Sequence, residues 1–231
     1  MSMPRLGRMT GPAGLVVAGA LLAGCGSASP GVAVQVGDEE ITTNQVDELA
    51  SEYCRAIGRQ LAAQNPPQVV PNRYFRGGIA GTLTMRSIGE QLGEEYDVEP
   101  GKTYDESVAQ LEQSVSVLDE EVRESVIEVE SSPAYVEAMQ AAVGQVLLEE
   151  EGGPSAKYTE QVARGQQAFE DWISANGVTF DPALGVTLEK GQVNSRDTSL
   201  SFAVGDTAVN GAADEPDPVY AAALPAAQTC R

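Results

Sequence analysis

Apolar residues recur at helical spacing over most of this chain, and that pattern limits the folds that the chain can adopt. The clearest run follows Thr42, which forms a helix N-terminal capping pattern with Gln45. Five apolar residues then follow at intervals of three and four: Val46, Leu49, Tyr53, Ile57 and Leu61. Side chains at these intervals share one face of an α-helix. The segment therefore predicts an amphipathic helix that ends before Pro66 and Pro67.

Four further segments also carry helix patterns. We expect helices over residues 72–95, over 103–131 as one or two helices, from the Ser132-Pro133 start signal to about 150, and over 155–175. Gly77, Gly78 and Gly81 weaken the first turns of the 72–95 helix, because each glycine costs about 1 kcal/mol relative to alanine. Together these segments predict a mainly α (α+β) fold.

Short β-branched segments flank the helical region. Residues 32–36 and 39–42 surround a Gly37-Asp38 turn and predict a hairpin. Three later segments predict strands: 178–180, 185–188 and 199–204. Residues 205–231 are rich in Gly, Ala, Asp and Pro, which predicts an extended C-terminal tail. We therefore expect one domain over residues 32–204, followed by that tail.

Residues 1–24 have the features of a secretory signal. Arg5 and Arg8 precede an apolar run over 13–23, and no acidic residue interrupts it. About eleven apolar residues form a helix of roughly 16 Å, which is about half the thickness of a bilayer core. No later segment approaches the roughly 18 apolar residues of a membrane-spanning helix. We therefore expect a mature chain that does not span a membrane.

The end of this leader, residues 22–25, resembles the lipobox of bacterial lipoproteins. The resemblance implies cleavage before Cys25, a diacylglyceryl thioether on its sulfur and usually a fatty acid such as palmitate on its amine. Residues 25–31 are small and polar and predict a flexible tether. Two or more acyl chains hold a protein stably on a membrane. We expect a lipid anchor at Cys25 on the extracytoplasmic face of the cell membrane; the alternative is an ordinary secretory signal with an incidental cysteine.

The chain contains three cysteines. Assigning Cys25 to the lipid leaves Cys54, in the first expected helix, and Cys230, the second-last residue. In an oxidising compartment these two are expected to form a disulfide. The bond would close a loop of 176 residues, for which the chain-entropy estimate has an upper bound of about 5 kcal/mol. The alternative is two free, buried thiols.

Composition excludes several kinds of function. The chain has no histidine, which excludes Ser-His-Asp catalysis and histidine-ligated zinc. No phosphate-binding glycine motif or calcium loop is present. Removing residues 1–24 leaves 12 basic and 34 acidic residues, a net charge of −22, which repels nucleic acid. We expect no metal, no cofactor and no enzymatic activity; a hydrolase using two carboxylates is the remote alternative.

Two short motifs resemble the SurA-type family of extracytoplasmic chaperones. Residues 34–42, VQVGDEEIT, resemble the opening hairpin of the family's N-terminal domain, and residues 178–185, VTFDPALG, resemble its closing strand. Ala183 and Leu184 stand where that strand usually carries an arginine and an aromatic residue. The resemblance implies a helical domain whose small β element is formed by the N-terminal hairpin and a C-terminal strand. We expect that the chain lacks, after residue 188, the parvulin-type isomerase domain that some members carry.

The resemblance also implies a function. Family members bind unfolded chains through apolar grooves, so we expect a lipid-anchored chaperone-like module that binds unfolded or extended polypeptides. Six aromatic side chains are candidate peptide contacts, although aromatic residues at helical spacing usually pack inward, which favours burial in the core for each: Tyr74, Phe75, Tyr96, Tyr135, Phe169 and Trp172. The second hypothesis is a structural lipoprotein that docks one envelope protein. Only Met85 and Met139 remain after cleavage, so a methionine-rich binding surface is absent.

Overall fold

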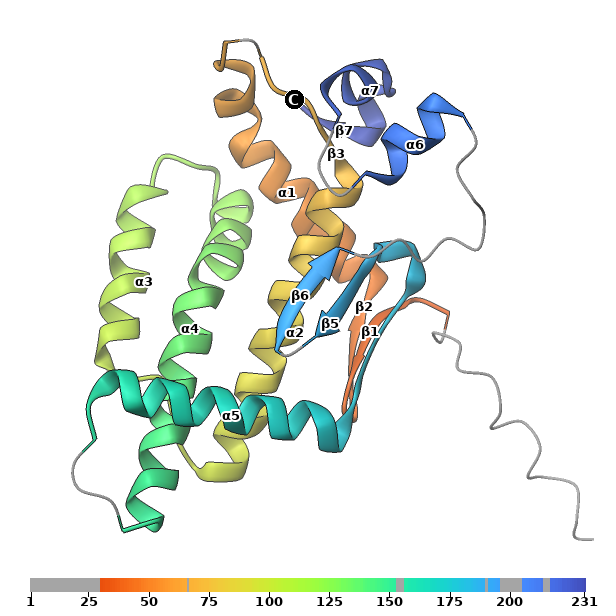
Figure 1. The fold of residues 1–231 in the computed structure, drawn as a ribbon. Coiled ribbons are helices and arrows are strands. Elements are labelled where there is room, and N and C mark those ends of the chain that lie inside the picture. Colours follow the sequence, from red (N-terminus) through yellow and green to blue (C-terminus); the bar gives the residue numbers. More distant parts are fainter. Residues whose placement is uncertain (1–29, 66, 153–155, 190, 196–204, 214–216) are drawn as a thin grey trace, which may run out of the picture.

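A computed structural model describes residues 30–231, with the exception of 66, 153–155, 190, 196–204 and 214–216 (Figure 1). The expected lipidation site at Cys25, the leader and most of the tether lie outside the described residues. The strand expected over 199–204 lies outside them as well. The remaining segments form seven α-helices and several short antiparallel strands among the described residues, which confirms the mainly α fold with a small β element.

A three-stranded antiparallel sheet joins the two ends of the helical region. Its strands, in the order β2-β1-β4, are β1 (Val32–Val36), β2 (Glu39–Thr42) and β4 (Val178–Phe180). The expected hairpin turn is present at Gly37, whose φ of +58° suits glycine. A Cβ at Gly37 would lie 3.1 Å from the Trp172 ring, so this glycine also lets the turn approach that side chain. The hairpin and the later strand pair as the sequence predicts.

Five helices form the body of the molecule (Figure 1). They are α1 (Thr43–Ala62), α2 (Asn72–Tyr96), α3 (Lys102–Ser114), α4 (Glu120–Glu150) and α5 (Tyr158–Asn176). The Thr42 side chain accepts a hydrogen bond of 3.2 Å from the Gln45 backbone N–H, which confirms the capping interaction. Gly177 ends α5 with a φ of +80°, as expected for a helix C-terminus.

Two glycines of α2 serve packing. Gly77 and Gly81 lie one turn apart and face a second hairpin, formed by β5 (Val186–Glu189) and β6 (Gln192–Ser195). A Cβ at Gly77 would lie 2.9 Å from Val186, and one at Gly81 would lie 2.6 Å from Val193. Any larger residue would push the hairpin away, so this packing explains two of the glycines that weaken the helix pattern. The residue pattern around β6 did not predict a strand there.

Helix α4 differs from its sequence prediction. A new helix was expected at Ser132-Pro133, but α4 continues through Pro133, and the break between helices lies earlier, at residues 115–119. A proline inside a helix removes one backbone hydrogen bond and costs about 3 kcal/mol. The hydroxyl of Ser132 donates to the Glu128 carbonyl at 2.6 Å next to this point. Tyr135 and Met139 are buried after the proline, so core packing holds the helix together across it.

The C-terminal segment is not the extended tail expected from its composition. It contains α6 (Asp206–Ala212), α7 (Pro218–Ala223) and β7 (Thr229–Cys230). Strand β7 pairs with the two-residue strand β3 (Val70–Pro71). The Asp217 side chain caps α7 by accepting from the Tyr220 N–H at 2.7 Å. These contacts bring the end of the chain back to α1 and α2 (Figure 1).

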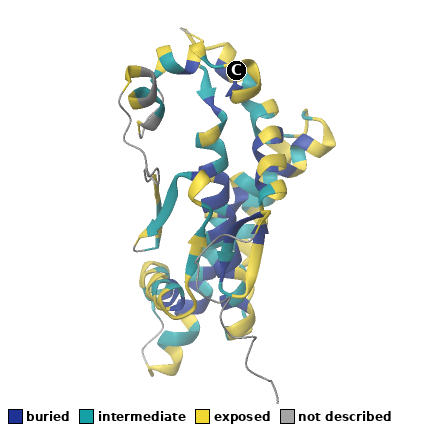
Figure 2. Cartoon of the chain, turned by 90° about the vertical axis from the view of Figure 1, so that its right-hand side faces the viewer, coloured by how far each residue is buried: buried dark blue, intermediate teal, exposed yellow. Residues whose placement is uncertain are grey.

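The hydrophobic core lies where the sheet meets α1, α2, α4 and α5. Figure 2 shows the buried residues concentrated in this body, whereas the end that carries the C-terminus is mostly half-buried or exposed. The largest fully buried side chains include Phe169, Ile88, Leu92 and Met139. Strand β1 contributes Val34 at the centre of the same cluster. The two ends of the helical region are thus fixed by one shared core.

Candidate functional site

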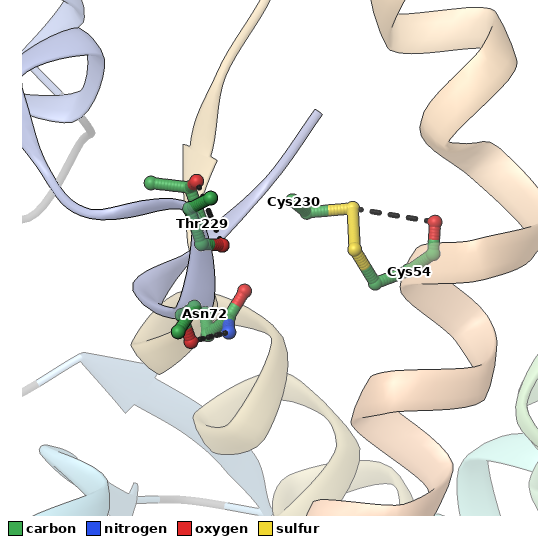
Figure 3. The surroundings of a disulfide bond; sticks show 6 residues. Cys54, Asn72, Thr229 and Cys230 are labelled. Carbon is green, nitrogen blue, oxygen red and sulfur yellow. Dashed lines mark hydrogen bonds between the residues drawn. A yellow bond between two sulfur atoms is a disulfide. The ribbon is translucent and has the colours of Figure 1, made fainter.

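A disulfide joins Cys54 of α1 to Cys230 of β7, with the two Cα atoms 5.5 Å apart (Figure 3). Cys230 is fully buried, and its sulfur lies 3.4 Å from the Cys54 carbonyl oxygen. The pairing is the one expected from the cysteine count. It fixes the second-last residue of the chain against the first helix.

Hydrogen bonds support this C-terminal attachment. The Asn72 amide, at the start of α2, donates to the Ala227 carbonyl at 3.1 Å (Figure 3). Arg73 and Tyr74 both donate to the Ala213 carbonyl, at 3.0 and 2.7 Å. The guanidinium of Arg73 also lies 4.5 Å from the centre of the Tyr74 ring. Tyr74, expected to contact peptides, instead holds the C-terminal segment of its own chain.

The other aromatic candidates separate into two groups. Tyr135, Phe169 and Trp172 are 8 %, 1 % and 8 % exposed, so they belong to the core and are not available to an open groove. For these three residues the peptide contact is wrong and burial in the core is confirmed, because the rings lie on the inward faces of α4 and α5. Phe75 and Tyr96 are half-buried against the same core. The structure does not bring the six residues together as one surface.

A polar network joins α1 to α4. Glu52 is buried, accepts a hydrogen bond from Ser125 of α4 and pairs with Arg55 at 3.2 Å. The Tyr53 hydroxyl donates to Glu130. Burial, this hydrogen bond and the Glu130 charge raise the pKa of Tyr53 to about 12. The sequence contains an indication of this network, namely an acidic residue on the apolar face of α1: Glu52 lies three residues after Leu49.

A second cluster lies between α2, α3 and α4. The Arg86 guanidinium lies 4.6 Å from the centre of the Tyr135 ring, and its Nε is 3.0 Å from Glu90. Tyr104 of α3 packs edge-on against Tyr135, with ring centroids 5.5 Å apart. Burial raises the pKa of Glu128, with Arg86 opposing and Glu90 adding to the effect. No local sequence pattern predicts this cluster, because its residues are spread over three helices.

The arrangement of charged groups in both clusters is that of helix-to-helix contacts. Glu52, Glu90 and Glu130 each have a partner on a neighbouring turn or helix, and the aromatic rings complete the packing. Within the described part of the chain, no three His, Cys, Asp or Glu side chains come together as metal ligands would. The same residues contain no helix with the length and apolar character needed to cross a membrane.

The surface of the described residues carries little large apolar area. Its exposed large hydrophobic residues lie on separate elements: Val117 after α3, Tyr158 at the start of α5, Val209 on α6 and Val219 on α7. Val117 is the most exposed, at 89 %. Isolated residues of this kind are normal on a protein surface, whereas a binding surface for many unfolded chains needs a continuous apolar area.

Comparison of this chain with protein-family models, with curated proteins and with solved structures found no match.

Proposed function

We propose that this protein is a lipid-anchored, non-enzymatic module on the extracytoplasmic face of the cell membrane that docks one envelope protein. The lipobox resemblance at Cys25 supports the anchor and the location. The joined cysteines Cys54 and Cys230 support an oxidising compartment, where such bonds persist. In that compartment the disulfide would keep the C-terminal segment attached to α1.

The filled core is the observation that carries the docking role. Tyr135, Phe169 and Trp172 pack inside, and Met139 is 1 % exposed, so the side chains best suited to gripping varied apolar segments are occupied. A docking module needs only one complementary patch, and that patch can be largely polar. The structure therefore supports one specific partner better than many unfolded clients.

Chaperone-like binding of unfolded polypeptides is the second candidate. The antiparallel pairing of β4 with β1 favours it, because this is the small β element that the SurA-type resemblance implies. On this proposal the clients would contact the half-buried rings of Phe75 and Tyr96, which border the core. Nucleic acid is not a proposed partner, because the acidic mature chain repels it.

Crosslinking in living cells tests the docking role directly. A photo-crosslinking residue is placed at exposed positions of the full chain, one variant at a time, and the adducts are separated by mass. We expect one saturable adduct of defined mass from a single face. A continuous smear of adducts would instead support the chaperone role.

A refolding assay on the mature, lipid-free protein provides the second readout. A holdase at equimolar concentration slows the light scattering of an aggregating client. We expect no slowing, because the exposed large hydrophobic residues of the described surface lie on separate elements. Strong suppression of aggregation would refute the docking proposal in favour of the chaperone.

A further inference from the structure

We propose that the docking surface is the α3–α4 arm, which we define as residues 102–132, and that its partner presents a cationic, amphipathic segment. This inference rests on the proposed docking function and names its site and the chemistry of the partner. The arm comprises α3 and the first part of α4. Helix α3 stands at the edge of the molecule beside α4 (Figure 1).

The arm has an apolar stripe that the rest of the protein covers only in part. Helix α3 contains no fully buried residue and packs mainly on α4. Its apolar residues Val108 and Leu111 are half-buried, as are Val115 and Leu118 in the turn that follows. Val117, in the same turn, is 89 % exposed. A partner segment that packs along this apolar stripe would remove its remaining apolar area from water.

The same arm concentrates negative charge. It holds nine acidic and two basic residues in 31 positions, a net charge of −7. All of its acidic residues except Glu128 are exposed. Two ion pairs neutralise part of this charge, Lys102 with Glu106 at 3.6 Å and Arg55 with Glu121 at 3.8 Å. Among the described residues, no Lys or Arg nitrogen lies within 4.0 Å of Glu112, Asp119, Glu120 or Glu124.

Charge and shape together identify the occupant. A row of apolar side chains bordered by carboxylates complements a helix with apolar residues on one face and Lys or Arg beside them. A second copy of this chain would bring an equally acidic arm, and the two would repel. The anionic lipid headgroups of a membrane surface are repelled for the same reason. The geometry therefore points to a basic segment of a protein partner.

Fluorescence anisotropy with synthetic peptides tests this directly. The protein is the mature chain with Cys25→Ser, so that no lipid interferes. The probe is a labelled peptide of about 14 residues, roughly four helical turns, with Leu and Lys placed at helical spacing. The control probe has Glu in place of every Lys. We expect saturable binding of the Lys peptide that weakens as salt is raised, and no binding of the Glu peptide.

Matched variants locate the binding surface. Glu120→Lys with Glu124→Lys reverses two charges on the arm, whereas Glu94→Lys with Glu95→Lys reverses two exposed charges at the end of α2. We expect the arm variant to weaken peptide binding at least tenfold at low salt, and the α2 variant to change it less than threefold. Val117→Ser removes apolar contact without disturbing the core and should weaken binding about threefold.

The outcomes separate this inference from the proposed function. Equal weakening by the two charge-reversal pairs would mean that binding follows only the overall charge of the protein, and would overturn the inference. The inference would also be overturned if Val117→Ser left peptide binding unchanged and the arm variant still bound the peptide at high salt. If the arm variant still forms the single cellular adduct, docking stands but uses another face. If the unchanged protein forms no adduct, the docking function itself fails.

Discussion

The crossing of α4 and α5 depends on two glycines that lie against the backbone of the opposite helix. A Cβ at Gly144 would lie 2.7 Å from the backbone nitrogen of Gly165, and closer still to the Gln161 carbonyl oxygen. A Cβ at Gly165 would lie 2.7 Å from the Cα of Gln140. Non-bonded carbon atoms need about 3.5 Å, so a single methyl group requires the helices to separate by on the order of 1 Å.

The energetic cost of Gly144→Ala follows from this geometry. Overpacking a core usually costs about 1–3 kcal/mol, and the upper end applies here because a backbone carbonyl cannot rotate away as a side chain can. Separation of the helices would also loosen the packing of Phe169, which is fully buried on α5. The better helix propensity of alanine offsets about 1 kcal/mol of this destabilisation. We expect a net loss of about 2 kcal/mol or more.

Urea unfolding followed by the fluorescence of Trp172 measures this loss. It is the one tryptophan of the chain and is buried on α5, so it reports on this interface. For an m-value of about 2–3 kcal/mol/M, the midpoint of Gly144→Ala should fall by roughly 0.7–1 M. Gly165→Ala should behave similarly. The double variant should cost less than the two single losses added together, because the first methyl group has already separated the helices.

Gly78→Ala is the matched control. Gly78 is an exposed helical glycine on α2, and nothing lies within 4 Å of a Cβ placed there. The same substitution should therefore raise stability by up to about 1 kcal/mol. If Gly144→Ala were as stable as Gly78→Ala, the close approach of α4 and α5 would be wrong, and the reasoning with it.

Three further predictions concern covalent bonds and pH. Reduction should lower the urea midpoint of the unchanged protein but not that of Cys54→Ser with Cys230→Ser, with an upper bound of about 5 kcal/mol on the loss; equal midpoints before and after reduction would show that the bond contributes nothing. Because the pKa of Glu128 is raised by burial, the folded state holds that proton more tightly than the unfolded chain, and this stability is lost as pH rises from about 4.5 through the raised value. The stability of Glu128→Gln, measured by urea unfolding relative to the unchanged protein, should therefore be higher at pH 7 than at pH 4. A larger relative stability at pH 4 would contradict the burial argument. Mass spectrometry of the membrane fraction should find acyl chains on Cys25, and Cys25→Ser should release the protein from that fraction; an unacylated chain that keeps its leader would refute the anchor.

Much of the helical framework could be predicted from local patterns. The bounds of α1, α2 and α5 follow apolar spacing and capping residues such as Thr42 and Gly177. Pro133 misled the same reasoning, because a helix that is packed on both sides of a proline can absorb its cost. The C-terminal segment misled it too, since its composition suits turns, whereas its helices form where α6 packs on α7 and α7 packs on β3.

The candidate sites were less predictable than the fold. Pairing of Cys54 with Cys230 could be predicted from the three cysteines of the sequence once the lipobox resemblance had assigned Cys25 to the lipid. Burial of Tyr135, Phe169 and Trp172 could not be predicted in this way, because an aromatic residue at helical spacing can face either the core or a groove. The cluster around Arg86 required three helices to meet, and no spacing along the chain encodes that meeting.

The sequence by itself determined the helical class, the opening hairpin and the acidic charge, and it carries the lipobox resemblance on which the proposed anchor rests. These depend on residues close together in the chain or on simple totals. Tertiary structure alone decided which aromatic rings were buried, why α2 carries glycines at Gly77 and Gly81, and where the apolar stripe of α3 was left partly uncovered. Those outcomes depend on which surfaces meet, and that is settled only when distant segments compete for the same core.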